Sequence, residues 1–116
     1  MRVLLDECLP RRLKRELVGH EARTAPEVGW ASKQSGDLLR VAVAAGFEAF
    51  VTVDRKLQHQ QNLSAFNIAV VVLEAKSNTL ADLRPLIPEV LEVLPKAPKG
   101  QATVVKSRDA RRLTID

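Results

Sequence analysis

The chain is poor in the residues that most often build recognisable metal or base-stacking sites. Its 116 residues include one cysteine, two histidines, three phenylalanines, one tryptophan and no tyrosine. A single cysteine forms no internal disulfide, and neither histidine has a Cys or His partner at the spacing of a zinc site. So few aromatic rings also argue against a dedicated reader of single strands that stacks bases on aromatic side chains.

Long apolar runs and glycine-rich phosphate loops are missing as well. No stretch approaches the roughly 20 apolar residues that a membrane-spanning helix needs, so we expect no membrane association. The first residues enter a strand pattern directly, without the features of a secretory signal, and with the lone cysteine this predicts a cytoplasmic protein. The five glycines form neither a P-loop nor a dinucleotide-binding fingerprint.

What the chain does contain is enough apolar sequence for one packed domain and a modest positive charge. Hydrophobic residues make up 46% of the sequence and charged residues 28%, which is typical of soluble globular proteins. The formal net charge of +4 permits a polyanionic partner but does not require one.

Strand-like and helix-like patterns alternate along the chain. Strand patterns occupy residues 3–5, 21–25, 50–53 and 68–73, and helical patterns occupy residues 7–18, 37–46, 57–63 and 79–94. This alternation predicts an α/β fold, with a parallel sheet of four strands between layers of helices joined by right-handed crossovers. Pro85 and Pro88 are expected to split or kink the last helix.

We expect one domain over residues 1–95, followed by a C-terminal segment over residues 96–116. This segment contains a linker, a candidate edge strand at residues 102–105 and a charged tail at residues 108–116. If the candidate edge strand joins the sheet, the sheet has five strands.

Two aspartates directly follow apolar strand patterns. Asp6 follows the first and Asp54 the third, and Asp37 begins the helix that leads into the third strand. If the first and third strands are neighbours, about 4.8 Å apart, their acids emerge side by side at the carboxyl end of the sheet, where such folds bind ligands. With Glu7, these acids would offer Mg²⁺ or Mn²⁺ the oxygen ligands that those ions prefer. The alternative roles are helix caps for Asp6 and Asp37, a turn for Asp54 and an ordinary first-turn acid for Glu7.

Basic residues lie close to these acids in the sequence. The first predicted helix carries Arg11, Arg12, Lys14 and Arg15. Arg55 and Lys56 directly follow Asp54. We regard Arg11, Arg12, Arg15, Arg55 and Lys56 as candidate nucleic-acid-binding residues, because cations beside an acidic notch can hold a phosphate backbone; the alternative is a solvated basic face.

Short motifs recur in the order and spacing of one known group. They are Leu4 through Asp6, Glu7 and Pro10 to Leu13; Gly19-His20-Glu21; Gly29-Trp30; Gly36-Asp37-Leu38-Leu39; Val51-Thr52-Val53-Asp54-Arg55; and Gln60-Gln61-Asn62-Leu63. Over roughly residues 1–95 this set resembles the small bacterial PIN-like proteins, which are related to PIN-domain toxins.

The resemblance implies a three-layer α/β/α domain and a ribonuclease dependent on Mg²⁺ or Mn²⁺. It assigns the catalytic, metal-binding role to Asp6, Asp37 and Asp54, and it matches Thr52 to a polar residue that binds a ligand or the attacking water. It also implies RNA as substrate, a cognate antitoxin protein as partner in a toxin–antitoxin pair, and a homodimer as a candidate assembly. Two positions depart from the pattern: Cys8 stands where many relatives have asparagine, and Lys56 where many have an acid or asparagine.

Two other functions remain open at this stage. A PIN-like fold can serve mainly as a binding or regulatory protein. A phospho-acceptor receiver domain is the other alternative, because Asp6, Glu7, Asp54 and the late Lys106 also match its pattern. Against the receiver, the fourth strand ends at Glu74, where a receiver has Ser or Thr.

Overall fold

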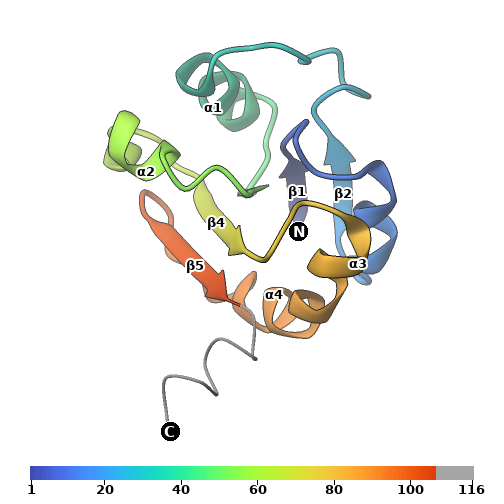
Figure 1. Cartoon of the computed structure of the whole chain (residues 1–116). Coiled ribbons are helices and arrows are strands. Elements are labelled where there is room, and N and C mark those ends of the chain that lie inside the picture. The colour runs from blue at the N-terminus through green and yellow to red at the C-terminus, as the bar shows by residue number, and fades with distance from the viewer. Residues whose placement is uncertain (107–116) are drawn as a thin grey trace, which may run out of the picture.

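The structure is a computed structural model that describes residues 1–106. It contains a five-stranded, all-parallel sheet with helical segments between the strands (Figure 1). The strands are β1 (Arg2–Leu5), β2 (Glu21–Thr24), β3 (Ala49–Thr52), β4 (Ala69–Glu74) and β5 (Ala102–Lys106). The predicted α/β fold is therefore confirmed, and the candidate edge strand is the fifth strand of the sheet. The tail predicted at residues 108–116 lies outside the described residues.

The helical segments are short, and several are 3-10 helices, labelled η. They are η1 (Arg11–Glu16), α1 (Ser35–Ala44), α2 (Leu57–Gln60), η2 (Leu63–Ala65), α3 (Leu80–Leu83), η3 (Arg84–Leu86) and α4 (Ile87–Val93). Within residues 1–106, no helix combines the length and the apolar character needed to cross a membrane.

The strand order is β2-β1-β3-β4-β5, so β1 lies between β2 and β3. The second strand, β2, pairs with one side of β1, and the third strand, β3, pairs with the other side. Strand order therefore reverses between β1 and β3. Leu5 is in register with both Thr24 of β2 and Val51 of β3. The expected neighbourhood of the first and third strands is thus confirmed.

The core consists of two apolar layers, one on each face of the sheet. Val3 and Leu5 point into a layer shared with η1, α3 and α4, whereas Leu4, between them, points into the opposite layer with α1 and α2. Figure 1 shows these helices on the two sides of the sheet. Because both faces are covered, the inner strands β1, β3 and β4 contain continuous apolar runs rather than alternating ones, whereas the edge strand β2 is more polar and exposed. This is the predicted three-layer α/β/α arrangement.

The first helix is much shorter than predicted. An α-helix was expected over residues 7–18, but the structure has a turn closed by the Leu9 amide on the Asp6 carbonyl, followed by η1. Pro10 is the reason, because its ψ of 139° is extended and it disfavours helical geometry at the residue before it. The Leu13 amide then bonds the Pro10 carbonyl, which is the spacing of a 3-10 helix.

The other helices agree better with the pattern. The helix predicted at residues 37–46 is α1, displaced by two residues. The helix predicted at residues 57–63 is interrupted because Gln61 adopts an extended conformation between α2 and η2. The last helix is split as expected: Pro85 and Pro88 each lie in the first turn of a new segment, where their missing N–H costs no hydrogen bond.

Candidate functional site

The carboxyl ends of β1 and β3 carry the acidic residues singled out by the sequence. Asp6 directly follows β1, and Asp54 lies two residues beyond Thr52, the last residue of β3. The Asp6 amide donates to the Val51 carbonyl at 3.0 Å, so the backbone pairing of the two strands continues one residue past β1. The two aspartates therefore lie at the reversal point of strand order, where open α/β sheets bind ligands. We call Asp6 and Asp54 the acid pair.

The Asp6 carboxylate is fixed by one hydrogen bond to each oxygen. Its Oδ1 accepts from the Glu7 amide at 2.8 Å, and its Oδ2 accepts from the Thr52 hydroxyl at 2.7 Å. Asp6 is half-buried, and a carboxylate oxygen that accepts one hydrogen bond retains lone-pair capacity for a further contact. The side chain is held in one orientation while its oxygens can still accept further contacts.

Thr52 connects the two members of the acid pair. Its side chain is completely buried, its hydroxyl donates to Asp6, and the same oxygen accepts from the Asp54 amide at 3.0 Å. Because the one hydroxyl proton is used on Asp6, Thr52 acts on the acid pair rather than on a ligand. Asp54 in turn accepts from the Lys56 amide through Oδ1 at 3.0 Å, a local turn that fixes its carboxylate.

The other predicted acids are engaged elsewhere. Glu7 is exposed, and its Oε1 accepts from the Ser32 amide at 3.1 Å. Asp37 is exposed in the first turn of α1 and forms an ion pair with Arg40 of the same helix at 2.8 Å. Among residues 1–106, no group of three or more His, Cys, Asp or Glu side chains is placed to hold a metal ion. The structure links Asp6 with Asp54, and Asp37 as a third catalytic acid stays a prediction.

The donor chemistry of the acid pair suits a hard divalent cation. Its two carboxylates are oxygen ligands, and Mg²⁺ is commonly held by one or two carboxylates while waters and substrate phosphates complete its shell. A set of only two protein carboxylates is thus sufficient for such an ion. Mg²⁺ or Mn²⁺ as the bound ion stays a prediction.

Cys8, one of the two departures from the family pattern, lies beside this network. Its sulfur is 3.8 Å from the Thr52 hydroxyl oxygen, and its carbonyl accepts from the Asn78 side chain at 2.8 Å. Burial raises the pKa of the Cys8 thiol, and the Asp6 charge adds to that rise. A thiol held in its neutral form packs as a small apolar group rather than as a nucleophile. Sequence patterns gave no signal for Asn78, since it comes from the distant loop before α3.

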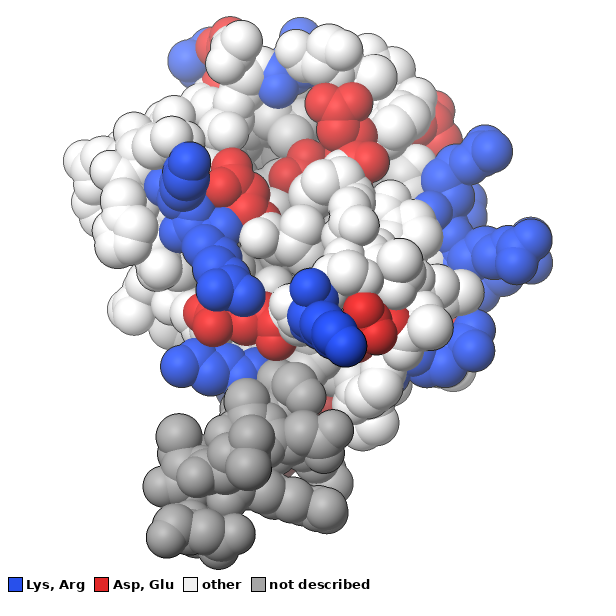
Figure 2. Space-filling view, in the orientation of Figure 1, with Lys and Arg blue, Asp and Glu red and all other residues white. Residues whose placement is uncertain are grey.

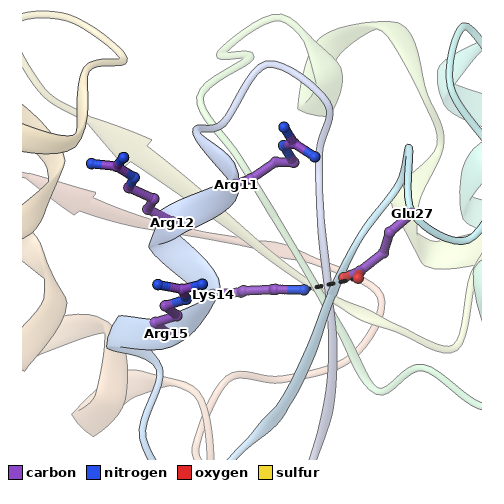
Figure 3. Close-up of a pocket in the computed structure, with 5 residues that line it drawn as sticks. All are labelled: Arg11, Arg12, Lys14, Arg15 and Glu27. Carbon is purple, nitrogen blue, oxygen red and sulfur yellow. Dashed lines mark hydrogen bonds and ion pairs between the residues drawn. The ribbon is translucent and has the colours of Figure 1, made fainter.

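The predicted basic patch lines a cavity of about 390 Å³ (Figure 3). Its lining residues are Arg11, Arg12, Lys14, Arg15 and Glu27. Lys14 forms an ion pair with Glu27 at 2.8 Å, and this hydrogen bond, together with one from the Thr24 amide, lowers the pKa of the Glu27 carboxyl. Figure 2 shows Lys and Arg side chains gathered at the side of the molecule where η1 lies. Sequence reasoning missed Glu27, because it lies in a predicted loop and only the pairing of β1 with β2 brings it to η1.

The remaining two predicted cations lie at the acid pair itself. Arg55 and Lys56 are exposed and directly follow Asp54. Their position in the sequence puts two positive charges next to Asp54.

Comparisons with protein-family models, curated proteins and solved structures gave no match for this chain. Membership of the PIN-like group therefore stays a prediction, and function has to be inferred from the chemistry of the site.

Proposed function

We propose that this chain is a PIN-like ribonuclease that depends on Mg²⁺ or Mn²⁺ and uses the acid pair as its active site. The observation that carries the proposal is the buried Thr52 hydroxyl, which joins Asp6 and Asp54 at the reversal point of strand order. One completely buried hydroxyl thus holds the Asp6 carboxylate and the backbone of Asp54 at neighbouring strand ends, and gathering two acids there is costly unless both are used together.

Asp6 and Asp54 are the residues that would hold the ion. When bound, a divalent cation supplies an activated water and neutralises charge on the scissile phosphate. Thr52 keeps Asp6 oriented through Oδ2, and the Lys56 amide keeps Asp54 oriented through Oδ1. These fixed orientations mean that little reorganisation is needed when the ion and the phosphate arrive.

The positive charges around the acid pair support RNA as the substrate. Arg55 and Lys56 directly follow Asp54, and Arg11, Arg12 and Arg15 add exposed positive charge on η1. Such cations attract the phosphate backbone irrespective of base sequence, at the cost of strong salt dependence. We propose Asp37, at the start of α1, as the third acid. To bind the ion, its carboxylate would give up the ion pair with Arg40.

The resemblance to PIN-like proteins also suggests a cellular role and partners for the nuclease. The nuclease would act in the cytoplasm as the toxin of a toxin–antitoxin pair, bind a cognate antitoxin protein, and assemble as a homodimer. A PIN-like fold that serves as a binding or regulatory protein is the alternative if the acid pair performs no chemistry.

A cleavage assay tests the proposal. End-labelled single-stranded RNA of mixed sequence is incubated with the full chain in Mg²⁺, in Mn²⁺ and in EDTA. We expect cleavage in either metal, none in EDTA, and a loss of at least about 100-fold in rate for Asp54→Asn, which removes a charged group acting on the transition state. Glu92→Gln is the matched control, because this exposed residue of α4 forms only a 3.9 Å ion pair with Lys96.

Two outcomes would contradict the nuclease. Absence of metal-dependent cleavage with RNA binding retained would favour the binding protein. Labelling of Asp54 by acetyl phosphate, lost in Asp54→Asn, would favour the receiver domain instead.

A further inference from the structure

The basic cavity beside η1 is a second charged feature, distinct from the acid pair. Four cations and one carboxylate line it, which leaves three positive charges in excess. In Figure 3, Lys14 reaches across to Glu27, whereas no contact is drawn to the three arginine side chains. All three arginines are exposed, and within residues 1–106 none of their side chains has a hydrogen-bond or ion-pair partner.

The Lys14–Glu27 ion pair connects η1 to the segment that follows β2. Glu27 also accepts from the Thr24 amide through Oε1 at 2.7 Å, and Thr24 ends β2. Glu27 is therefore tied both to η1 and to the end of a strand. Lys14 uses its charge on this contact, so the arginines are the groups that remain for an incoming anion.

Glu27 and the cavity lie at the carboxyl ends of the strands, as the acid pair does. Thr24 is in register with Leu5, and the Ala25 amide donates to the Leu5 carbonyl at 2.9 Å. Asp6 is the next residue along the chain. A strand of nucleic acid that lies over the ends of β2, β1 and β3 would thus pass over both the cavity and the acid pair.

The lining favours phosphate over the other anionic partners. A guanidinium presents a planar fork of N–H donors that matches phosphate oxygens in a bidentate manner. A protein interface has an apolar centre with aromatic side chains, yet none of the described residues lining this cavity is apolar. Without aromatic rings, the cavity can hold the backbone but cannot stack the bases, so its contacts are independent of sequence.

We propose that the cavity formed by Arg11, Arg12, Arg15 and the Lys14–Glu27 pair is a docking site for backbone phosphates of single-stranded RNA. It holds the strand to one side of the acid pair, and it acts without metal. This inference rests on the proposed function for its substrate class, but its contacts are separate from the residues that would perform the cleavage.

Metal-free RNA binding tests the inference apart from cleavage. The fluorescence anisotropy of a labelled single-stranded RNA of mixed sequence is measured in EDTA over a range of salt concentrations. Each phosphate contact to a single strand contributes about 0.7 to the salt slope, so each of Arg11→Gln, Arg12→Gln and Arg15→Gln should weaken binding about fivefold at ~0.1 M salt. The triple variant should weaken it by about 100-fold and lower the slope by about 2.

Three further variants sharpen the result. Lys99→Gln removes one charge before β5, at the far edge and opposite end of the sheet, and should leave affinity nearly unchanged. Arg12→Lys should keep the salt slope while losing part of the affinity, because it retains the charge but not the fork. Asp54→Asn, measured without metal, should bind RNA at least as well as the unmodified chain does, because it removes a negative charge that repels the backbone.

The outcomes separate this inference from the proposed function. Equal affinity of the triple variant and the unmodified chain, or an equal loss in Lys99→Gln, would overturn the docking site whether or not the protein cleaves RNA. Tighter binding of a glutamate-rich peptide than of RNA with the same charge would assign the cavity to an acidic protein instead. Loss of cleavage in Asp54→Asn with binding retained supports both proposals. If the triple variant does not fold, the three single variants carry the test, since buried Leu13, the residue that anchors η1 in the core, is unchanged in each.

Discussion

Replacing Thr52 by valine removes the hydroxyl that joins the acid pair and leaves the shape of the side chain almost unchanged. Two hydrogen bonds to the acid pair are lost, the one donated to the Asp6 carboxylate at 2.7 Å and the one accepted from the Asp54 amide at 3.0 Å, together with the weaker 3.8 Å contact of the Cys8 sulfur. The backbone of β3 and the apolar contacts of the Thr52 methyl group can remain as they are. The change in stability therefore reports on the hydroxyl itself.

The expected loss follows from the partners of the hydroxyl. A hydrogen bond to a charged group contributes about 1.5–3 kcal/mol and one between neutral groups about 0.5–1.5 kcal/mol. Asp6 and Asp54 are only half-buried, so water replaces part of what is lost. We expect the free energy of unfolding to fall by about 2 kcal/mol, which lowers the urea midpoint by about 1 M for a chain of this size.

A double-mutant cycle separates the hydrogen bond from simple packing. The Thr52→Val effect is measured by urea unfolding in the native background and in Asp6→Ala, and we expect a coupling energy of about 1–2 kcal/mol. Thr52→Ser is the control: it keeps the hydroxyl, loses a buried methyl group at about 1 kcal/mol, and should show almost no coupling to Asp6. A coupling energy below about 0.5 kcal/mol for the valine variant would refute the linkage of the acid pair through Thr52.

Three further predictions concern the acids and their neighbours. Asp54→Asn should abolish the binding of Mn²⁺ measured by calorimetry while slightly stabilising the metal-free protein, because one of two neighbouring negative charges is gone; unchanged Mn²⁺ affinity would contradict it. Lys56→Asp should tighten Mn²⁺ binding in the same assay, since it replaces a repelling charge by an attracting one, and unchanged binding would show that this side chain does not face the site. Lys14 lowers the pKa of the Glu27 carboxyl below its ordinary value of 4.5, so Glu27 stabilises the fold above that pH and loses this contribution as the pH falls below it. The difference in unfolding free energy between the native chain and Glu27→Gln should accordingly be present at neutral pH and vanish in acid, and a difference independent of pH would argue against the ion pair.

The sequence was sufficient to predict the strands and the position of Asp6 and Asp54 after two of them, whereas the adjacency of those two strands was only a condition. Apolar runs ending in Asp6 and Asp54 are local signals, and the alternation of strands and helices restricts the sheet to few arrangements. The Asp37–Arg40 ion pair could also have been predicted from the sequence, because residues three apart on a helix are neighbours.

Contacts between distant segments could not be predicted from such local signals. The Thr52 hydroxyl reaches Asp6 only because β1 and β3 pair in one particular register, and Glu27 reaches Lys14 only because β2 takes the other side of β1. The error at the first helix has a different origin. The spacing of apolar residues was helical, but the extended conformation of Pro10 limited the segment to a short 3-10 helix.

Paramagnetic broadening in NMR spectra of the ¹⁵N-labelled chain tests most directly whether the acid pair is a metal site. Mn²⁺ is titrated into the protein, and the backbone amide signals are followed residue by residue. We expect the signals of Asp6, Glu7 and residues 53–56 to broaden first, and this broadening to disappear in Asp54→Asn. Broadening that begins elsewhere, or that is unchanged in Asp54→Asn, would contradict it.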